Sequence, residues 1–195
     1  MFKSHPKGLL AAALSNMGER FGYYIMNAVL ALFLCSKFGL AEGQAGLIYS
    51  IFYAGIYILS LVGGLIADKT QNYKGTIMTG LAIMASGYVV LSIPVLATPQ
   101  NSSFLLTVTC LALFLIAFGN GLFKGNLQAI VGQMYDNFEA EEAKKGEEAL
   151  AIAKDKRDSG FQIFYVFINV GGVIVPFVAP LLREWWLKAN GLVYN

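Results

Sequence analysis

The sequence predicts an all-α, polytopic membrane protein with five membrane-spanning helices. Hydrophobic residues make up 56% of its 195 residues and charged residues only 13%. A soluble domain of this size carries about a quarter charged residues, because its surface faces water. Charged residues are also absent from three long stretches, which lie between Glu42 and Asp68, between Lys74 and Lys124, and between Asp158 and Arg183. A helix needs roughly 20 mostly apolar residues to cross a bilayer, so each stretch can hold at least one crossing.

The apolar segments place the five spans at about 8–38, 45–67, 75–96, 104–135 and 160–186. The uncharged stretch 75–123 is too long for one crossing, and it divides near 94–103, where Pro, Asn and Ser are typical of a turn. A polar segment of about 136–158 separates the last two spans, and its Ala, Glu and Lys residues favour a helix. We expect this segment to be a charged cytoplasmic helical loop that links the two spans.

Basic residues predict the orientation, because cytoplasmic loops carry an excess of Lys and Arg. One side of the five spans has nine basic residues: Lys3, Lys7, Lys69, Lys74, Lys144, Lys145, Lys154, Lys156 and Arg157. The opposite side has three, which are Lys37, Arg183 and Lys188. We therefore expect a multi-pass protein of the plasma membrane, the inner membrane in a bacterium, with a cytoplasmic N-terminus.

Several other classes of function find no support in the sequence. The net charge of +2 is too small to indicate a nucleic-acid partner. No cluster of histidines and no Ser–His–Asp set falls within the spans, so no enzyme is predicted. Cys35 and Cys110 lack the spacing of metal ligands, so no metal site is predicted either.

Charged residues inside two of the spans indicate a functional site. A charge at mid-membrane costs roughly 2.5–3.5 kcal/mol, and such residues usually face a bundle interior and belong to a pathway or site. In the first span Glu19 and Arg20 share one helical face with Asn16, Tyr23 and Asn27. The alternative is a balanced pair of charges that only holds helices together.

The fourth span carries Lys124 on one face with Asn120 and Gln128. The alternative is a lysine that extends its ammonium to the membrane interface. We expect Glu19, Arg20 and Lys124 to converge on one water-filled crevice within a helical bundle.

Two further spans have polar faces. The second span places Tyr49, Tyr53 and Tyr57 on one face, and the fifth places Asn169 on a face with Tyr165. For Asn169 a ligand contact and a hydrogen bond between helices, worth about 0.6 kcal/mol, both stay open.

Four motifs together resemble those of the proton-coupled oligopeptide transporters. NMGERFGYY (16–24) resembles the ExxERFxYYG signature of that family, and GGLIAD (63–68) is similar to the loop motif of the major facilitator superfamily. GNGLFKGN (119–126) resembles the fourth-helix segment that holds a family lysine, and RDSGFQIFYVFINVGG (157–172) resembles the fifth-helix signature FYxxINxG. The motifs stand in family order and cover nearly the whole chain.

The resemblance implies proton-driven symport of di- and tripeptides, with small peptides, protons and the lipid bilayer as partners. It implies no cofactor other than the proton as coupling ion. The implied substrate-binding residues are Arg20, Tyr23, Tyr24, Tyr57, Lys124 and Asn169. Proton coupling would rest on Glu19 and Lys124, and Gly64 and Asp68 would belong to the loop that takes part in conformational gating.

The chain departs from the family pattern at Asn16, where the signature has Glu, and an amide cannot titrate. Family members also have at least twelve spans in two halves, whereas five spans match most of the N-terminal six-helix half. We expect an incomplete N-terminal portion that lacks the C-terminal half, since WLKANGLVYN is typical of a loop cut short. The alternatives are the same fold carrying another small solute, or a five-helix structural or regulatory subunit without transport activity.

Overall fold

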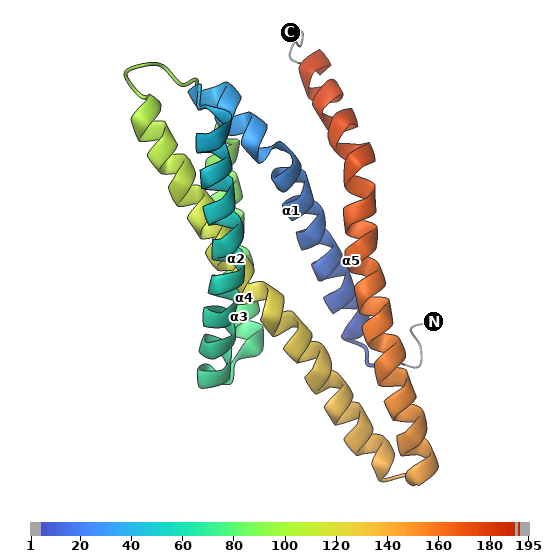
Figure 1. Cartoon of the computed structure of the whole chain (residues 1–195). Helices are drawn as coiled ribbons and strands as arrows, with labels where there is room; N and C mark the ends of the chain where they lie inside the picture. The colour runs from blue at the N-terminus through green and yellow to red at the C-terminus, as the bar shows by residue number, and fades with distance from the viewer. Residues whose placement is uncertain (1–4, 190, 192–195) are drawn as a thin grey trace. The chain divides into compact units, whose positions relative to one another are not determined.

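The computed structural model describes residues 5–189 and 191, so Lys3 and most of the final loop lie outside the described residues. The described part forms five helices: α1 (Leu9–Phe38), α2 (Glu42–Thr70), α3 (Tyr73–Ser92), α4 (Ser102–Ala143) and α5 (Glu147–Ala189). All five are long and apolar enough to cross a membrane (Figure 1). The predicted all-α class with five candidate spans is confirmed.

Local chemistry accounts for the break between α2 and α3. Gln71 adopts a left-handed conformation with φ of 51° directly after α2. The Asn72 side chain then accepts a hydrogen bond of 2.9 Å from the Gly75 backbone N–H, which caps the start of α3. At its other end α3 stops at Ser92 rather than near residue 96. Ile93 precedes Pro94, and a residue that precedes a proline is disfavoured in the helical region of backbone conformation.

The charged segment of about 136–158 differs from the separate helical loop that the sequence predicts. Its residues form the last turns of α4 and the first turns of α5, with only a short turn at 144–146 between them (Figure 1). Gly146 has φ of 130°, a conformation that L side chains rarely adopt, and it ends the helical run. The helix-favouring residues on both sides of this turn extend the two helices instead of forming a third one.

The chain divides into two compact units. The first contains the described residues up to Ala28 and those from Met134 onward, and the second contains Val29–Gln133. The first unit therefore combines the start of α1 and the end of α4 with α5. The second combines the end of α1 and most of α4 with α2 and α3.

Close helix crossings hold the second unit together. A side chain at Gly63 would bring its Cβ within 2.7 Å of the Gly121 carbonyl carbon, and one at Gly80 would come within 2.7 Å of the Gly119 carbonyl oxygen. Asn126, which is 2% exposed, donates a hydrogen bond of 3.0 Å from Nδ2 to the Gly63 carbonyl oxygen. Small residues let α2 and α3 approach the backbone of α4 closely, as is common between membrane helices.

The first unit packs α5 against α1 and the end of α4. A Cβ at Gly171 would lie 2.8 Å from the Met17 carbonyl oxygen, and the fully buried Tyr135 ring lies against Gly160. Arg157 of α5 donates hydrogen bonds to Asp136 Oδ1 at 2.7 Å and to Glu139 Oε1 at 3.3 Å on α4.

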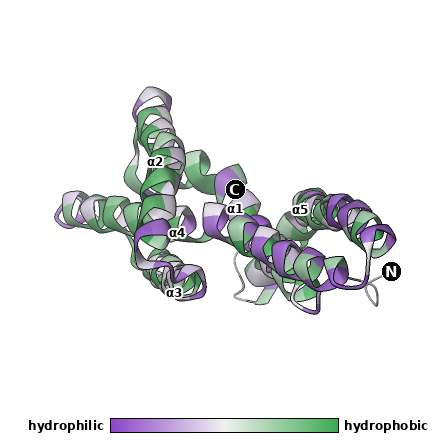
Figure 2. Ribbon diagram, turned by 90° about the horizontal axis from the view of Figure 1, so that it is seen from below, coloured by the Kyte–Doolittle hydropathy of each residue, from purple (hydrophilic) through white to green (hydrophobic). Residues whose placement is uncertain are grey.

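Large apolar side chains cover much of the helix surfaces. Leu61 is 73% exposed and Phe177 is 70% exposed, and hydrophobic residues run along most of α2 (Figure 2). Exposed apolar surface of this extent would be unfavourable in water and is expected of helices that contact lipid.

Candidate functional site

The first candidate cluster is built around two adjacent charged residues of α1. Arg20 Nη2 donates a hydrogen bond to Glu19 Oε1 at 2.8 Å, and Arg20 Nε donates to Glu19 Oε2. The two residues are each 7% exposed. A guanidinium that meets a carboxylate through two parallel N–H groups is among the stronger charge-assisted hydrogen-bond arrangements. Each charge therefore compensates for the loss of water around the other.

Aromatic rings extend this cluster along α1. The Arg20 guanidinium carbon lies 4.9 Å from the centroid of the Tyr23 ring, within the range of a cation–π interaction. The Tyr23 and Tyr24 rings are in edge-to-face contact, with centroids 5.5 Å apart. A Cβ at Gly172 of α5 would lie 3.1 Å from Tyr24 Cε2, so the glycine leaves room for that ring.

The geometry bears on the alternative in which the two charges only hold helices together. The ion pair joins neighbouring side chains of a single helix, so this pair does not itself link two helices. Asn16, one turn earlier, is also buried, at 6% exposed. On the predicted polar face of α1, Asn27 is half-buried and the other residues are buried, with the carboxylate and guanidinium together at its centre.

Asn169 lies on α5 in the same unit. Its side chain is exposed, and Nδ2 donates a hydrogen bond of 3.2 Å to the Tyr165 backbone oxygen of its own helix. This bond does not join two helices, so it does not correspond to the inter-helix bond that the sequence left open. The Asn169 carboxamide thus lies on the surface of the described part of the chain.

The second candidate cluster joins α2 to α4 within the second unit. Lys124 Nζ lies 4.6 Å from the centroid of the Tyr57 ring, and the Tyr57 hydroxyl lies 3.2 Å from the Tyr53 hydroxyl. Lys124 is half-buried, whereas Tyr53 and Tyr57 are exposed. The close approach at Gly63 and Gly121, described above, brings the two helices near enough for this contact.

The predicted gating residues lie at the end of α2. A Cβ at Gly64 would meet no other described residue within 4 Å, so packing among the described residues does not require this glycine. The Asp68 carboxylate accepts a hydrogen bond of 2.5 Å from the hydroxyl of Tyr73, the first residue of α3. The carboxylate therefore ties the two helices together across their turn.

The structure brings together Glu19, Arg20 and Tyr23 in the first unit, and Tyr57 and Lys124 in the second. Convergence of the two clusters on one crevice stays a prediction. The helical period places Tyr53 on the same face of α2 as Tyr57, but Tyr53 is not among the predicted site residues. The spacing of four residues between the two tyrosines was the signal for their contact, since such side chains are neighbours on a helix.

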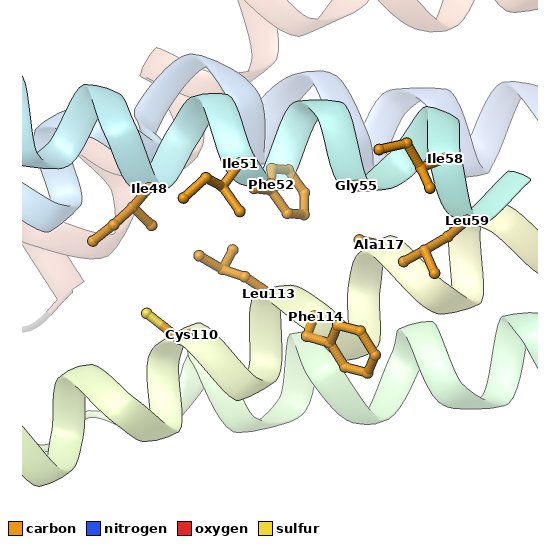
Figure 3. Close-up of a pocket in the computed structure, with 10 residues that line it drawn as sticks. All are labelled: Ile48, Ile51, Phe52, Gly55, Ile58, Leu59, Cys110, Leu113, Phe114 and Ala117. Carbon is orange, nitrogen blue, oxygen red and sulfur yellow. The ribbon is translucent and has the colours of Figure 1, made fainter.

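A separate cavity of about 360 Å³ lies between α2 and α4 and contains none of the predicted site residues (Figure 3). Its lining is apolar throughout and consists of Ile48, Ile51, Phe52, Gly55, Ile58, Leu59, Cys110, Leu113, Phe114 and Ala117. Burying a charged group there without a partner would be costly. The polar clusters, rather than this cavity, are thus the candidates for a charged ligand.

Each of the two clusters contains groups that can bind a charged solute. Arg20 and Lys124 are cations that can receive a carboxylate, and Arg20 can do so through two parallel N–H donors. The tyrosine hydroxyls and the Asn169 amide supply uncharged hydrogen-bonding groups. The Glu19 carboxylate can exchange a proton, and its charge competes for Arg20.

Known proteins match this chain along most of its length. Residues 74–194 match the model of the POT family. The chain is 33% identical over 190 residues to a di-/tripeptide transporter of Lactococcus lactis subsp. cremoris, covering 94% of this chain and 33% of the relative. It is 34% identical over 195 residues to the peptide transporter YePEPT of Yersinia enterocolitica, covering 97% of this chain and 33% of the relative.

Solved structures give the same result. The crystal structure of tetrameric PepTSo2 superimposes with a TM-score of 0.75 at 28% identity, covering 94% of this chain and 34% of the other. A peptide transporter POT in complex with sulfate superimposes with a TM-score of 0.69 at 35% identity, covering 91% of this chain and 32% of the other. The chain thus spans about one third of the length of the curated relatives it matches. On these matches, the chain is a multi-pass membrane protein that belongs to the POT family.

Proposed function

We propose that the chain works in proton-driven symport of di- and tripeptides across the plasma membrane, together with the further helices that its relatives possess. The names of its relatives support a transporter rather than an enzyme: relatives that match over nearly all of this chain are called di-/tripeptide transporter and peptide transporter. Alternating access of the substrate requires two halves that rock against each other. In this proposal the chain supplies the N-terminal part of the first half.

The buried Glu19–Arg20 pair is the observation that carries this proposal. While Glu19 is ionised, both of its oxygens accept hydrogen bonds from Arg20, so the guanidinium is already neutralised. A proton that binds Glu19 removes this competing charge and frees Arg20 for the carboxylate of a peptide. Proton binding and peptide binding then favour each other, as symport requires. Asn16 cannot titrate, so in this proposal Glu19 carries the coupling on this face of α1.

The remaining residues take the other parts of the peptide. Lys124 provides a second cation for the carboxylate and also takes part in proton coupling. Tyr23, Tyr24 and Tyr57 donate hydrogen bonds, and Asn169 contacts the peptide backbone or its amino end. The amide is suited to this position because it offers both a donor and an acceptor.

The turn between α2 and α3 is assigned to conformational gating. The hydrogen bond between Tyr73 and Asp68 fixes the first residue of α3 to the end of α2. Gly64 is open on its Cβ side, so a neighbouring helix can approach it in another state of the transport cycle. A cytoplasmic N-terminus places this turn on the cytoplasmic side.

A chimera tests the function. Residues 1–195 replace the matched third of the Lactococcus lactis di-/tripeptide transporter, and dipeptide uptake is measured in liposomes with an inward proton gradient. We expect accumulation of the peptide by the unmodified chimera. Glu19→Gln should abolish accumulation but preserve exchange of labelled for unlabelled peptide, because binding no longer depends on a proton. Glu42→Gln, which removes an exposed carboxylate at the start of α2, is the matched control.

Three results would contradict the proposal. A chimera that folds but transports no dipeptide would contradict peptide transport as the function. Uptake inhibited by nitrate or free amino acids more strongly than by dipeptides would assign another small solute to the same fold. Accumulation by Glu19→Gln equal to that of the control would remove Glu19 from proton coupling.

A further inference from the structure

Three tyrosines form a continuous aromatic ladder on one face of α2. The Tyr49 and Tyr53 rings are stacked, with centroids 6.3 Å apart and planes inclined by 10°. The Tyr53 and Tyr57 rings follow with centroids 5.2 Å apart and planes inclined by 58°. Tyr53, in the middle of the ladder, therefore contacts an aromatic ring on each side.

The ladder ends on a charge. Lys124 Nζ lies 4.6 Å from the centroid of Tyr57, while the Tyr57 hydroxyl lies 3.2 Å from that of Tyr53. The Lys124 ammonium contacts the face of the Tyr57 ring, and the Tyr53 hydroxyl forms a hydrogen bond with the Tyr57 hydroxyl. Both contacts constrain how Tyr57 can rotate about its side-chain bonds.

We propose that Tyr53 is a positioning residue, which holds the Tyr57 ring against Lys124 and so fixes the ammonium for the carboxylate of a ligand. The inference rests on the proposed function in that the ligand is a peptide. In the proposed arrangement the Tyr53 hydroxyl is the donor to Tyr57. Because a phenol has a single O–H donor, the Tyr57 proton is then left to donate to the same carboxylate as Lys124.

The exposure of these side chains argues against a purely structural role for the hydroxyl pair. Tyr53 is 41% exposed and Tyr57 is 51% exposed. Both hydroxyls lie on the surface of the described helices, so their hydrogen bond is not needed to satisfy polar groups buried among those helices. What the bond does provide is a defined orientation of Tyr57 in front of Lys124, and orientation of this kind strengthens binding by reducing the entropy lost when the ligand binds.

The test removes one oxygen from the ladder. In the chimera described above, Tyr53→Phe preserves the ring contacts but loses the hydroxyl. We expect KM for a dipeptide to rise about threefold to tenfold, the loss expected of one hydrogen bond, with kcat unchanged. Tyr49→Phe is the matched control, since it removes a hydroxyl from the ladder without touching Tyr57. In a Lys124→Gln background, Tyr53→Phe should cause no further rise in KM, because its effect acts through Lys124.

A second measurement does not depend on transport. The purified chain of residues 1–195 is treated with an amine-acetylating reagent at fixed pH, and acetylation of Lys124 is followed by mass spectrometry of its peptides. Tyr53→Phe should accelerate acetylation of Lys124, because the Tyr57 ring is no longer held over Nζ. Tyr57→Leu should also accelerate it, because the ring is absent, whereas Tyr49→Phe should not.

The outcomes separate the two proposals. Acetylation of Lys124 at the wild-type rate in Tyr53→Phe would overturn the positioning role, as would an unchanged KM in a chimera that transports dipeptides. Faster acetylation of Lys124 in Tyr53→Phe would support the positioning role even where the chimera transports no peptide. The absence of transport would then contradict the proposed function alone.

Discussion

His5 links the start of the chain to the end of α4. Its Nδ1 lies 2.7 Å from the Tyr135 hydroxyl, and the edges of the two rings meet with centroids 6.2 Å apart. Burial, and then the positive charge of Lys156, lower the pKa of His5 below its ordinary value of 6.5. The folded protein thus favours a neutral imidazole, while the unfolded chain takes up a proton more readily.

This linkage predicts a stability that depends on pH. The contribution of His5 is complete above its unfolded pKa of about 6.5, and it decreases as the pH falls from there through the lower folded pKa. We expect the melting temperature of the chain in detergent to fall between pH 7.5 and pH 5, and to fall less in His5→Gln. An equal fall in both proteins, measured by thermal unfolding, would show that the acid sensitivity comes from other groups.

At the scale of the helices, the crossing of α2 and α4 depends on the absence of a single methyl group. Gly63 and Gly64 are neighbours in the sequence, yet a Cβ at Gly63 would overlap the backbone at Gly121 and one at Gly64 would meet nothing within 4 Å. Gly63 also offers its carbonyl oxygen to Asn126. Close packing therefore requires a glycine at position 63 but not at position 64.

We expect Gly63→Ala to destabilise the protein by about 1–3 kcal/mol, the usual cost of overpacking a close contact. Gly64→Ala should be neutral or stabilising by up to about 1 kcal/mol, since alanine favours a helix more than glycine does. Unfolding in mixed micelles with increasing SDS measures both values. Equal losses of stability in the two variants would mean that the crossing can relax around a methyl group.

At the scale of the whole molecule, the predicted cytoplasmic N-terminus depends on where the basic residues lie. His5 contacts Tyr135, and Arg157 contacts Asp136, so the start of the chain and the charged ends of α4 and α5 lie at one end of that unit. Most basic residues of the more positive side belong to these segments: Lys7, Lys144, Lys145, Lys154, Lys156 and Arg157. These basic residues are therefore gathered at one end of the unit, and the positive-inside rule, which counts Lys and Arg rather than net charge, predicts that this end is cytoplasmic.

This arrangement predicts the result of cysteine labelling in intact cells. In a variant with Cys35 and Cys110 replaced by Ala, the cysteine introduced by Lys144→Cys should be protected from a membrane-impermeant maleimide until the cells are opened. A cysteine at Asn101, in the turn between α3 and α4, should react in intact cells. The reverse pattern would place the N-terminus outside.

The sequence alone predicted the five helices, the polar faces of α1, α2 and α4, and the motifs of the family, because hydropathy and helical period are local properties of the chain. It could not give the ends of the helices around 136–158, since residues that favour a helix do not specify whether one helix or the ends of two will form.

Only the tertiary structure decided which side chains meet. It paired Lys124 with the face of Tyr57, joined Tyr57 to Tyr53, and showed that Gly63 rather than Gly64 forms the helix crossing. These contacts depend on how closely two helices approach and how they are rotated about their axes. That geometry follows from the fit of small and large side chains on both helices at once, which no single segment of the sequence contains.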